Sequence, residues 1–264
     1  MKHKQRFTFL MGLLLLLPMS ASAEHFWMAL FSKEMRYTEQ TFLVQKYLKN
    51  LNNSIDKEWD RGFMITDIQY GNDLWMATLS KGTGYTHQAY VKKRDWKEFT
   101  QAVGKHLEKG FMLVNVEYGD GTWVAVLVKG SPFTKGRYDV IRYWEDVPAK
   151  ITQRWNEGYH LIDIEPADGK WVAVFAKNTG FTDQAYDSVD EETAVDQIIK
   201  KRWDEGYRLL NSEYGDGRWF LIFVKDKKKK GQLYVRRERV NGVKEAISTH
   251  WNRGMNLIDL SEGR

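Results

Sequence analysis

Apolar residues recur along this chain in short runs that begin with tryptophan and end with lysine. The clearest are WVAVLVK at 123–129, WVAVFAK at 171–177 and WFLIFVK at 219–225. Runs of this length, bounded by turn residues, predict strands. A GDG-type sequence precedes two of them and ADG the third, which predicts tight turns that lead into each strand from the preceding one.

A second pattern has the spacing of a helix. In AVDQIIKKRWDEG (194–206), Val195, Ile199 and Trp203 fall at i, i+4 and i+8, which predicts one inward-facing stripe. Leu51, Ile55 and Trp59 repeat this spacing near the start of the chain. The glycine that follows each such segment suits the left-handed residue that ends a helix.

Both patterns repeat with a fixed period of 48 residues. The strand tryptophans stand at Trp27, Trp75, Trp123, Trp171 and Trp219, and the helix positions at Trp59, Leu107, Trp155, Trp203 and Trp251. A glycine lies three residues after each helix position. The sequence therefore predicts one repeat domain over 24–264, made of units at about 25–72, 73–120, 121–168, 169–216 and 217–264.

Each unit is predicted to run strand, strand, helix, strand. This order resembles the pentein architecture, so we expect an α/β fold of five tandem units closed into a five-fold pseudo-symmetric α/β-propeller. The alternatives are a five-bladed all-β propeller, against which the helical spacing argues, and an open solenoid, for which the ends of the chain supply no caps.

Three phrases support a family resemblance: GTGYTHQAY (82–90), ITQRWNEGYHL (151–161) and NTGFTDQAY (178–186). They resemble the tryptophan-rich repeat region C-terminal to the kinase domain of plant casein-kinase-like proteins, which is similar to stand-alone bacterial secreted proteins. The resemblance spans the mature chain but implies no activity. No kinase signature is present, and unit five departs from the pattern with DKKKKGQ at 226–232.

The first 23 residues have the features of a signal peptide. A basic start, MKHKQR, precedes a short apolar run and a small-residue cleavage site. We therefore expect export to a periplasm or beyond, with no membrane span after cleavage. Removing this segment leaves 37 basic and 35 acidic residues, a net charge of +2. This balance does not favour a nucleic-acid binder, and the absence of cysteine excludes disulfides and thiolate chemistry.

The last strand of each unit carries a column of polar residues in an apolar setting. Its members are Asp67, Asn115, Asp163, Asn211 and Asp259, and two residues further on come Gln69, Glu117, Glu165, Glu213 and Ser261. Residues two apart in a strand share a face. We expect these side chains either to bond to the backbone of a neighbouring unit or to line a wet central channel as two stacked rings.

Lysine closes the first strand of every unit, at Lys33, Lys81, Lys129, Lys177 and Lys225. The favoured interpretation is an aliphatic stem lying over neighbouring aromatic rings. The alternative is a cationic ring for an anionic ligand. Symmetry breaks elsewhere, at the lysine run Lys227, Lys228, Lys229 and Lys230, and at Trp96 and Trp144, which we expect to form an exposed patch.

These features predict an exported, non-enzymatic binding or scaffold protein with a polar ring near its axis and partner-binding loops. We expect no cofactor and no metal, and a partner that is a protein, a glycan or an anionic envelope surface. The alternative function is a hydrolase that acts on a saccharide or peptide through axial carboxylates. A third hypothesis is a purely structural assembly module.

Overall fold

The structure is a computed structural model that describes residues 25–33, 36–226 and 231–264. Its helices are α1 (Leu48–Asp60), α2 (Trp96–Glu108), α3 (Val147–Asn156), α4 (Glu192–Asp204) and α5 (Val240–Trp251), with a short 3-10 turn at Trp144–Asp146. The strands are β1 (Phe26–Ser32), β2 (Glu39–Gln45), β3 (Met64–Gly71), β4 (Leu74–Lys81), β5 (His87–Lys93), β6 (Met112–Gly119), β7 (Thr122–Lys129), β8 (Thr134–Ile141), β9 (His160–Ala167), β10 (Lys170–Lys177), β11 (Phe181–Val189), β12 (Arg208–Gly215), β13 (Arg218–Asp226), β14 (Gln232–Arg237) and β15 (Asn256–Gly263).

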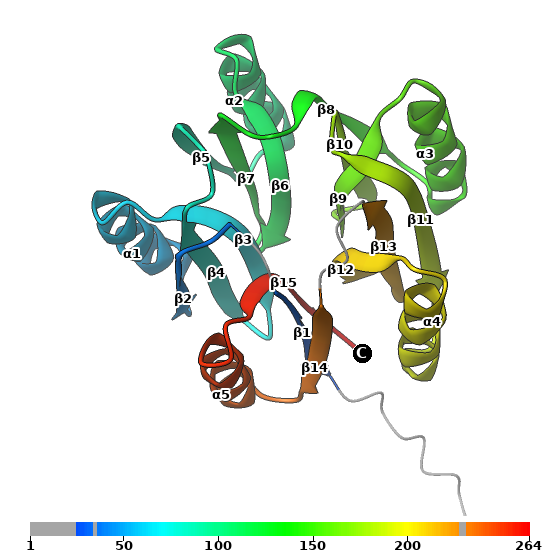
Figure 1. Ribbon diagram of the computed structural model, residues 1–264. Coiled ribbons are helices and arrows are strands. Elements are labelled where there is room, and N and C mark those ends of the chain that lie inside the picture. Colours follow the sequence, from blue (N-terminus) through cyan, green and yellow to red (C-terminus); the bar gives the residue numbers. More distant parts are fainter. Residues whose placement is uncertain (1–24, 34–35, 227–230) are drawn as a thin grey trace, which may run out of the picture.

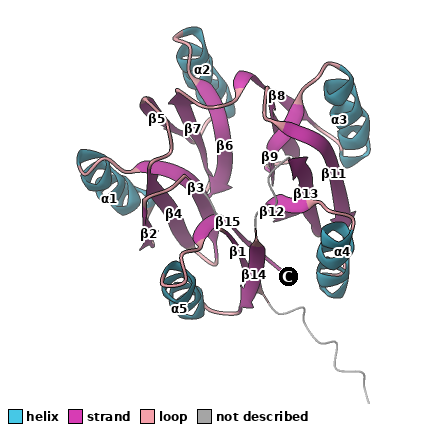
Figure 2. Cartoon of the chain, viewed as in Figure 1, coloured by secondary structure: helices cyan, strands magenta, loops and turns pink. Residues whose placement is uncertain are grey.

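The strands form five antiparallel three-stranded sheets, ordered β2-β4-β3, β5-β7-β6, β8-β10-β9, β11-β13-β12 and β14-β1-β15. We call each sheet with its helix a module and number the modules in that order. The sheets lie around a common centre, with the helices on the outer rim (Figures 1 and 2). The predicted repetition of five α/β units is therefore confirmed, and the all-β alternative is wrong because every module contains a helix.

Each module is one strand out of step with the repeat in the sequence. The tryptophan-led strand of one sequence unit becomes the middle strand of the sheet formed mainly by the unit before it. For β1 that sheet is module five, where it pairs with β14 and β15 from the other end of the chain. The two ends of the described chain are thereby joined in one sheet.

The middle strands explain the uninterrupted apolar runs, because both of their faces are buried. On β7, Trp123, Ala125 and Leu127 pack with the helix of their own module. The alternate residues Val124, Val126 and Val128 pack into the core of module one. The same exchange links each module to the next, and all five strand tryptophans are buried, which confirms them as core.

The turns follow the glycine and Asp-Gly signals. Gly62 ends α1 with a φ of 85°, and the equivalent glycines after the other helices have φ between 71° and 84°. Asp120 and Gly121 both have positive φ, as the mirror-image turn of a two-residue hairpin requires. These turns place β3, β6, β9, β12 and β15 innermost, where each contacts two others in cyclic order.

Candidate functional site: two tiers of buried polar residues

A β-bulge in each innermost strand sets the direction of the polar column. The register against the middle strand slips by one residue at Thr66, Val114, Ile162, Leu210 and Ile258. Each bulge comes directly before the Asp or Asn, and a bulge re-aims the side chains that follow it. We call Asp67, Asn115, Asp163, Asn211 and Asp259 the first tier, and Gln69, Glu117, Glu165, Glu213 and Ser261 the second tier. All ten side chains are buried.

Asp163 shows how the first tier works. One of its oxygens accepts the backbone N–H of Val116 in the neighbouring module at 2.8 Å. The other accepts the side-chain amides of Asn115 and Asn211, each at 3.4 Å. A carboxylate on one module is therefore bonded to the modules on both sides, which is the latch between units that the sequence left open as one alternative.

Asp259 makes the same kind of contact. It accepts the Ser212 N–H at 3.1 Å, the Ser212 hydroxyl at 2.6 Å and the Asn211 amide at 3.2 Å. Asp67 accepts a backbone hydrogen bond from Leu260 of module five. The first tier thus crosses the junction between modules five and one.

A five-membered ring cannot alternate Asp and Asn all the way round. In the order of the modules, Asn115 lies between Asp67 and Asp163, and Asn211 lies between Asp163 and Asp259. Where the ring closes, Asp259 and Asp67 are neighbours with no amide between them. Burial, and next the charge of Asp259, raise the pKa of Asp67 well above its ordinary value. Burial also raises the pKa of Asp163 and of Asp259 to about 7.

The second tier is less well supplied with donors. Glu165 accepts the Tyr118 N–H at 3.0 Å, and Glu117 accepts the backbone N–H of Tyr70. The equivalent donor for Glu213 would be residue 166, which is proline and has no N–H. Within the described residues, the Glu213 carboxylate has burial and neighbouring carboxylates around it and no hydrogen bond. Oε2 of Glu117 is buried there without a partner.

The three glutamates nevertheless lie together. Their carboxylate oxygens are within 4.8 Å of one another, a grouping that can hold a metal ion. Burial, followed by neighbouring carboxylates, raises the pKa of all three well above the ordinary value. Gln69 and Ser261 complete the tier with neutral groups, and the Ser261 hydroxyl lies 2.7 Å from that of Ser212.

The column of lysines is placed away from both tiers. Lys81, Lys129, Lys177 and Lys225 each lie 4.1–4.8 Å from the centre of an aromatic ring in their own module, on Phe63, Phe111, Tyr159 and Tyr207. Lys33 is exposed. The lysines do have aromatic neighbours, but the ammonium group rather than the aliphatic stem lies over each ring, as a cation–π contact.

The expectation that Trp96 and Trp144 form an exposed patch is wrong on exposure, because both are half-buried. Trp96 packs 4.7 Å from Trp123, and Lys170 of module three lies over its ring. Trp144 repeats this against Trp171, with Arg218 of module four over it. Each ring is thus held between its own module and the next. Lys227, Lys228, Lys229 and Lys230 lie outside the described residues.

A column of glutamines went unrecognised in the sequence. Gln184 accepts hydrogen bonds from Trp155 Nε1 and the Leu161 N–H, at 2.6 and 2.8 Å, and donates to the Leu161 carbonyl at 2.7 Å. Gln184 belongs to module four and its partners to module three. The equivalent residues Gln40, Gln88 and Gln232 bond to the equivalent backbone of the preceding module in the same way.

One module lacks this glutamine, and the sequence shows a matching change at the position of its partner. Gly136 stands where the fifth glutamine would be, and Leu107 replaces the tryptophan that it would bind. A side chain at Gly136 would collide with Met112, which fills the space. Two positions 29 residues apart therefore depart from the repeat together, which is the mark of a contact between units.

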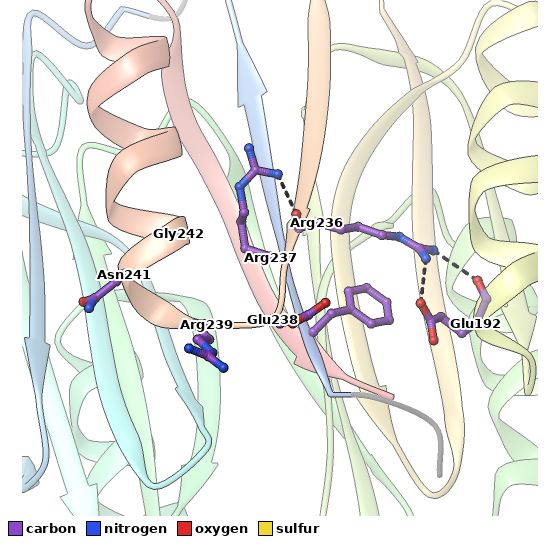
Figure 3. A pocket seen from close by; sticks show the side chains of 8 residues that line it. Glu192, Arg236, Arg237, Glu238, Arg239, Asn241 and Gly242 are labelled. Carbon is purple, nitrogen blue, oxygen red and sulfur yellow. Dashed lines mark hydrogen bonds and ion pairs between the residues drawn. The ribbon is translucent and has the colours of Figure 1, made fainter. Parts of the chain in front are cut away.

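Two surface cavities lie outside the tiers. The larger, about 540 Å³, lies between modules four and five and is lined by Phe26, Glu192, Arg236, Arg237, Glu238, Arg239, Asn241 and Gly242. We call it the arginine cleft (Figure 3). Arg236 is paired with Glu192 at 2.9 Å. Among the described residues, Arg237 bonds only to a backbone carbonyl, and Arg239, the residue before α5, makes no side-chain cap. The smaller cavity, about 410 Å³, lies beside Trp144 and Tyr143.

Comparisons with known proteins add the family. No helix in the described ranges is both long and apolar enough to cross a membrane. Neither the curated proteins nor the solved structures give a match. The model of one family matches residues 17–264, so the chain belongs to the family described as a domain of unknown function, DUF7477.

Proposed function

We propose that the chain is an exported, non-enzymatic binding or scaffold protein, built as a closed five-fold α/β-propeller. Three features support closure. β1 pairs with β14 and β15, the innermost strands contact one another in cyclic order, and each module shares its core with the next. The resemblance to the tryptophan-rich repeat region of casein-kinase-like proteins agrees with such an architecture and stays a prediction.

One observation carries the non-enzymatic part of the proposal: Asp163 and Glu165, the carboxylates that the hydrolase alternative would use, are buried and hydrogen-bonded within the fold. Asp163 and Glu165 are only 2% and 5% exposed, and both accept hydrogen bonds from the backbone of the neighbouring module. A glycosidic bond is cleaved between two carboxylates that flank it, and a peptide would likewise have to reach the carboxylates that act on it. Buried latches do not offer that access, so the geometry gives the hydrolase alternative no support.

Export is supported by the sequence of residues 1–23, with a periplasmic or secreted location as the proposal. A protein in that location meets anionic envelope surfaces. The arginine cleft suits such a partner, because Arg237 and Arg239 are exposed and no ion pair joins either of them to an acidic side chain in the described part of the chain.

The test is sedimentation with lipid vesicles. We expect the protein to co-sediment with vesicles containing phosphatidylglycerol and not with pure phosphatidylcholine vesicles. Replacing Arg237 and Arg239 with Ser should abolish this binding. Replacing the exposed residues Lys49 and Lys57 of α1 with Ser removes the same charge from module one and should leave it intact. Equal loss in both variants, or no binding to either vesicle, would refute an anionic-surface role for the cleft.

A further inference from the structure

We propose that the second tier binds one divalent cation of the calcium type, held by the carboxylates of Glu117, Glu165 and Glu213. These side chains come from β6, β9 and β12, three consecutive innermost strands. The site goes beyond the proposed function and does not depend on it, since it lies at the centre of the molecule and the arginine cleft lies at the rim.

The first argument is charge. Three carboxylates with oxygens within 4.8 Å of one another are 2–5% exposed. No lysine or arginine forms an ion pair with them in the described ranges, and the lysine column lies over aromatic rings instead. Buried like charges at this separation repel strongly, so the three groups either hold protons, as their raised pKa values indicate, or need a counter-charge between them. A cation at the centre of the three supplies it.

The second argument is independent of the acidic groups. The side-chain oxygens of Asn115 and Asn211 are buried and accept no hydrogen bond from any described residue. The two residues are only 8% and 6% exposed. Both amide nitrogens face Asp163, so both oxygens face away from it. Each Asn lies two residues before a cluster glutamate, on the same inward strand face. Buried acceptors without donors call for an unseen water or ion, and waters on a bound cation would donate to them.

The third argument comes from the strands themselves. A second-tier glutamate accepts a hydrogen bond from the neighbouring strand where a backbone N–H is available, as Glu165 does from Tyr118. Pro166 removes the donor that Glu213 would use, and Glu213 is still buried with its carboxylate among the other two. A buried carboxylate with no donor is costly for the fold alone. Its presence is explained when it serves as a ligand.

The chemistry of the ligands selects the ion. All three are hard carboxylate oxygens, and no histidine or cysteine belongs to the cluster, which disfavours zinc. Calcium takes six to eight oxygens at about 2.3–2.6 Å, so two ligands on one ion lie at most about 5 Å apart. Magnesium retains most of its waters and rarely accepts three protein carboxylates. The cluster therefore fits calcium best.

The test is calorimetric titration of the purified, EDTA-dialysed protein with CaCl2, with MgCl2 and ZnCl2 as comparisons. We expect one calcium ion per chain. The midpoint of thermal unfolding should rise by about 5–10 °C when free calcium is 100 times its dissociation constant. Glu213→Gln should weaken binding at least about tenfold. This residue accepts no backbone hydrogen bond, so the variant should fold.

The control is Glu108→Gln, an exposed glutamate at the end of α2, which should bind calcium as the unaltered protein does. If Glu213→Gln does not fold, Glu165→Gln takes its place. The proposal is overturned by the absence of both heat and a midpoint shift up to millimolar calcium. It is equally overturned by unchanged affinity in the glutamate variant, or by tighter binding of magnesium or zinc.

Discussion

The two tiers occupy the same faces of the same five strands, two residues apart, yet they meet their neighbours differently. In the first tier, each aspartate has a backbone donor on the adjacent module, and the asparagines add side-chain donors. In the second tier, Glu213 faces Pro166 and has none in the described part of the chain. A buried carboxylate stabilises the fold only where the adjacent module supplies hydrogen-bond donors to it.

The largest effect is expected when the first tier is broken. Asp163→Ala removes the acceptor for the Val116 N–H and for the Asn115 amide, and leaves the Asn211 amide bonded to Asp259 alone. Buried donors without acceptors should cost about 3 kcal/mol, which lowers the midpoint of thermal unfolding by about 6–12 °C. The exposed Asp60→Ala on α1 should leave the midpoint unchanged. A loss of similar size in both variants would remove the special role of the tier.

A smaller loss of stability is expected when a contact between modules outside the two tiers is removed. Gln184→Ala leaves Trp155 Nε1, the Leu161 N–H and the Leu161 carbonyl without their hydrogen-bond partner. We expect a loss of about 2 kcal/mol, or about 4–8 °C in the midpoint.

The comparison for this variant is Gln232→Ala. Gln232 bonds to the backbone of Leu209, while the indole N–H of Trp203 has no partner. Gln232→Ala should therefore lower the free energy of unfolding by less than Gln184→Ala does. If thermal unfolding shows the two losses to be equal, the indole contact contributes nothing.

The smallest effect concerns the seam where Asp259 adjoins Asp67. Because the pKa of Asp67 is raised in the folded state, that carboxyl holds its proton more tightly there than in the unfolded chain. Its contribution to stability is present below the ordinary pKa and is lost as pH rises through the folded value. Asp67→Asn removes the charge while keeping an oxygen for the Leu260 N–H.

Asp67→Asn should therefore match the unaltered protein near pH 4 and unfold a few degrees higher at pH 8. Thermal unfolding across that range, in the presence of a chelator, measures the difference. Asp60→Asn, on the surface, should show no such trend. A gain that is independent of pH, or greatest in acid, would contradict the assignment of a charged seam.

The sequence predicted what every unit needs and, apart from the polar column, missed what joins the units. The 48-residue period, the buried tryptophans and the left-handed glycines could be read directly, because each follows from local packing or backbone geometry. The bulge before Asp163 could not, since no residue type demands it. The placement of β1 in the last sheet also depends on contacts between distant residues.

Part of the missed information was present in the irregularities. Leu107 and Gly136 depart from the repeat together, and the structure places Gly136 against Met112 of the preceding module, at a junction where other modules pair a glutamine with a tryptophan. Trp96 and Trp144 were assigned to the surface because they are not repeated in all five units. In the structure they are half-buried between modules, which a repeat count cannot reveal.

The most direct test of the central claim applies one chemical change to both tiers. Asp163→Asn and Glu213→Gln each replace a buried carboxylate with an amide of the same shape, and their free energies of unfolding are compared at pH 8 in a chelator. Asp163 is surrounded by donors, so an amide there sets donor against donor and should destabilise the fold. Glu213 has only like charges beside it, so an amide there should stabilise the fold. Opposite signs would support the account. Changes of the same sign would contradict it.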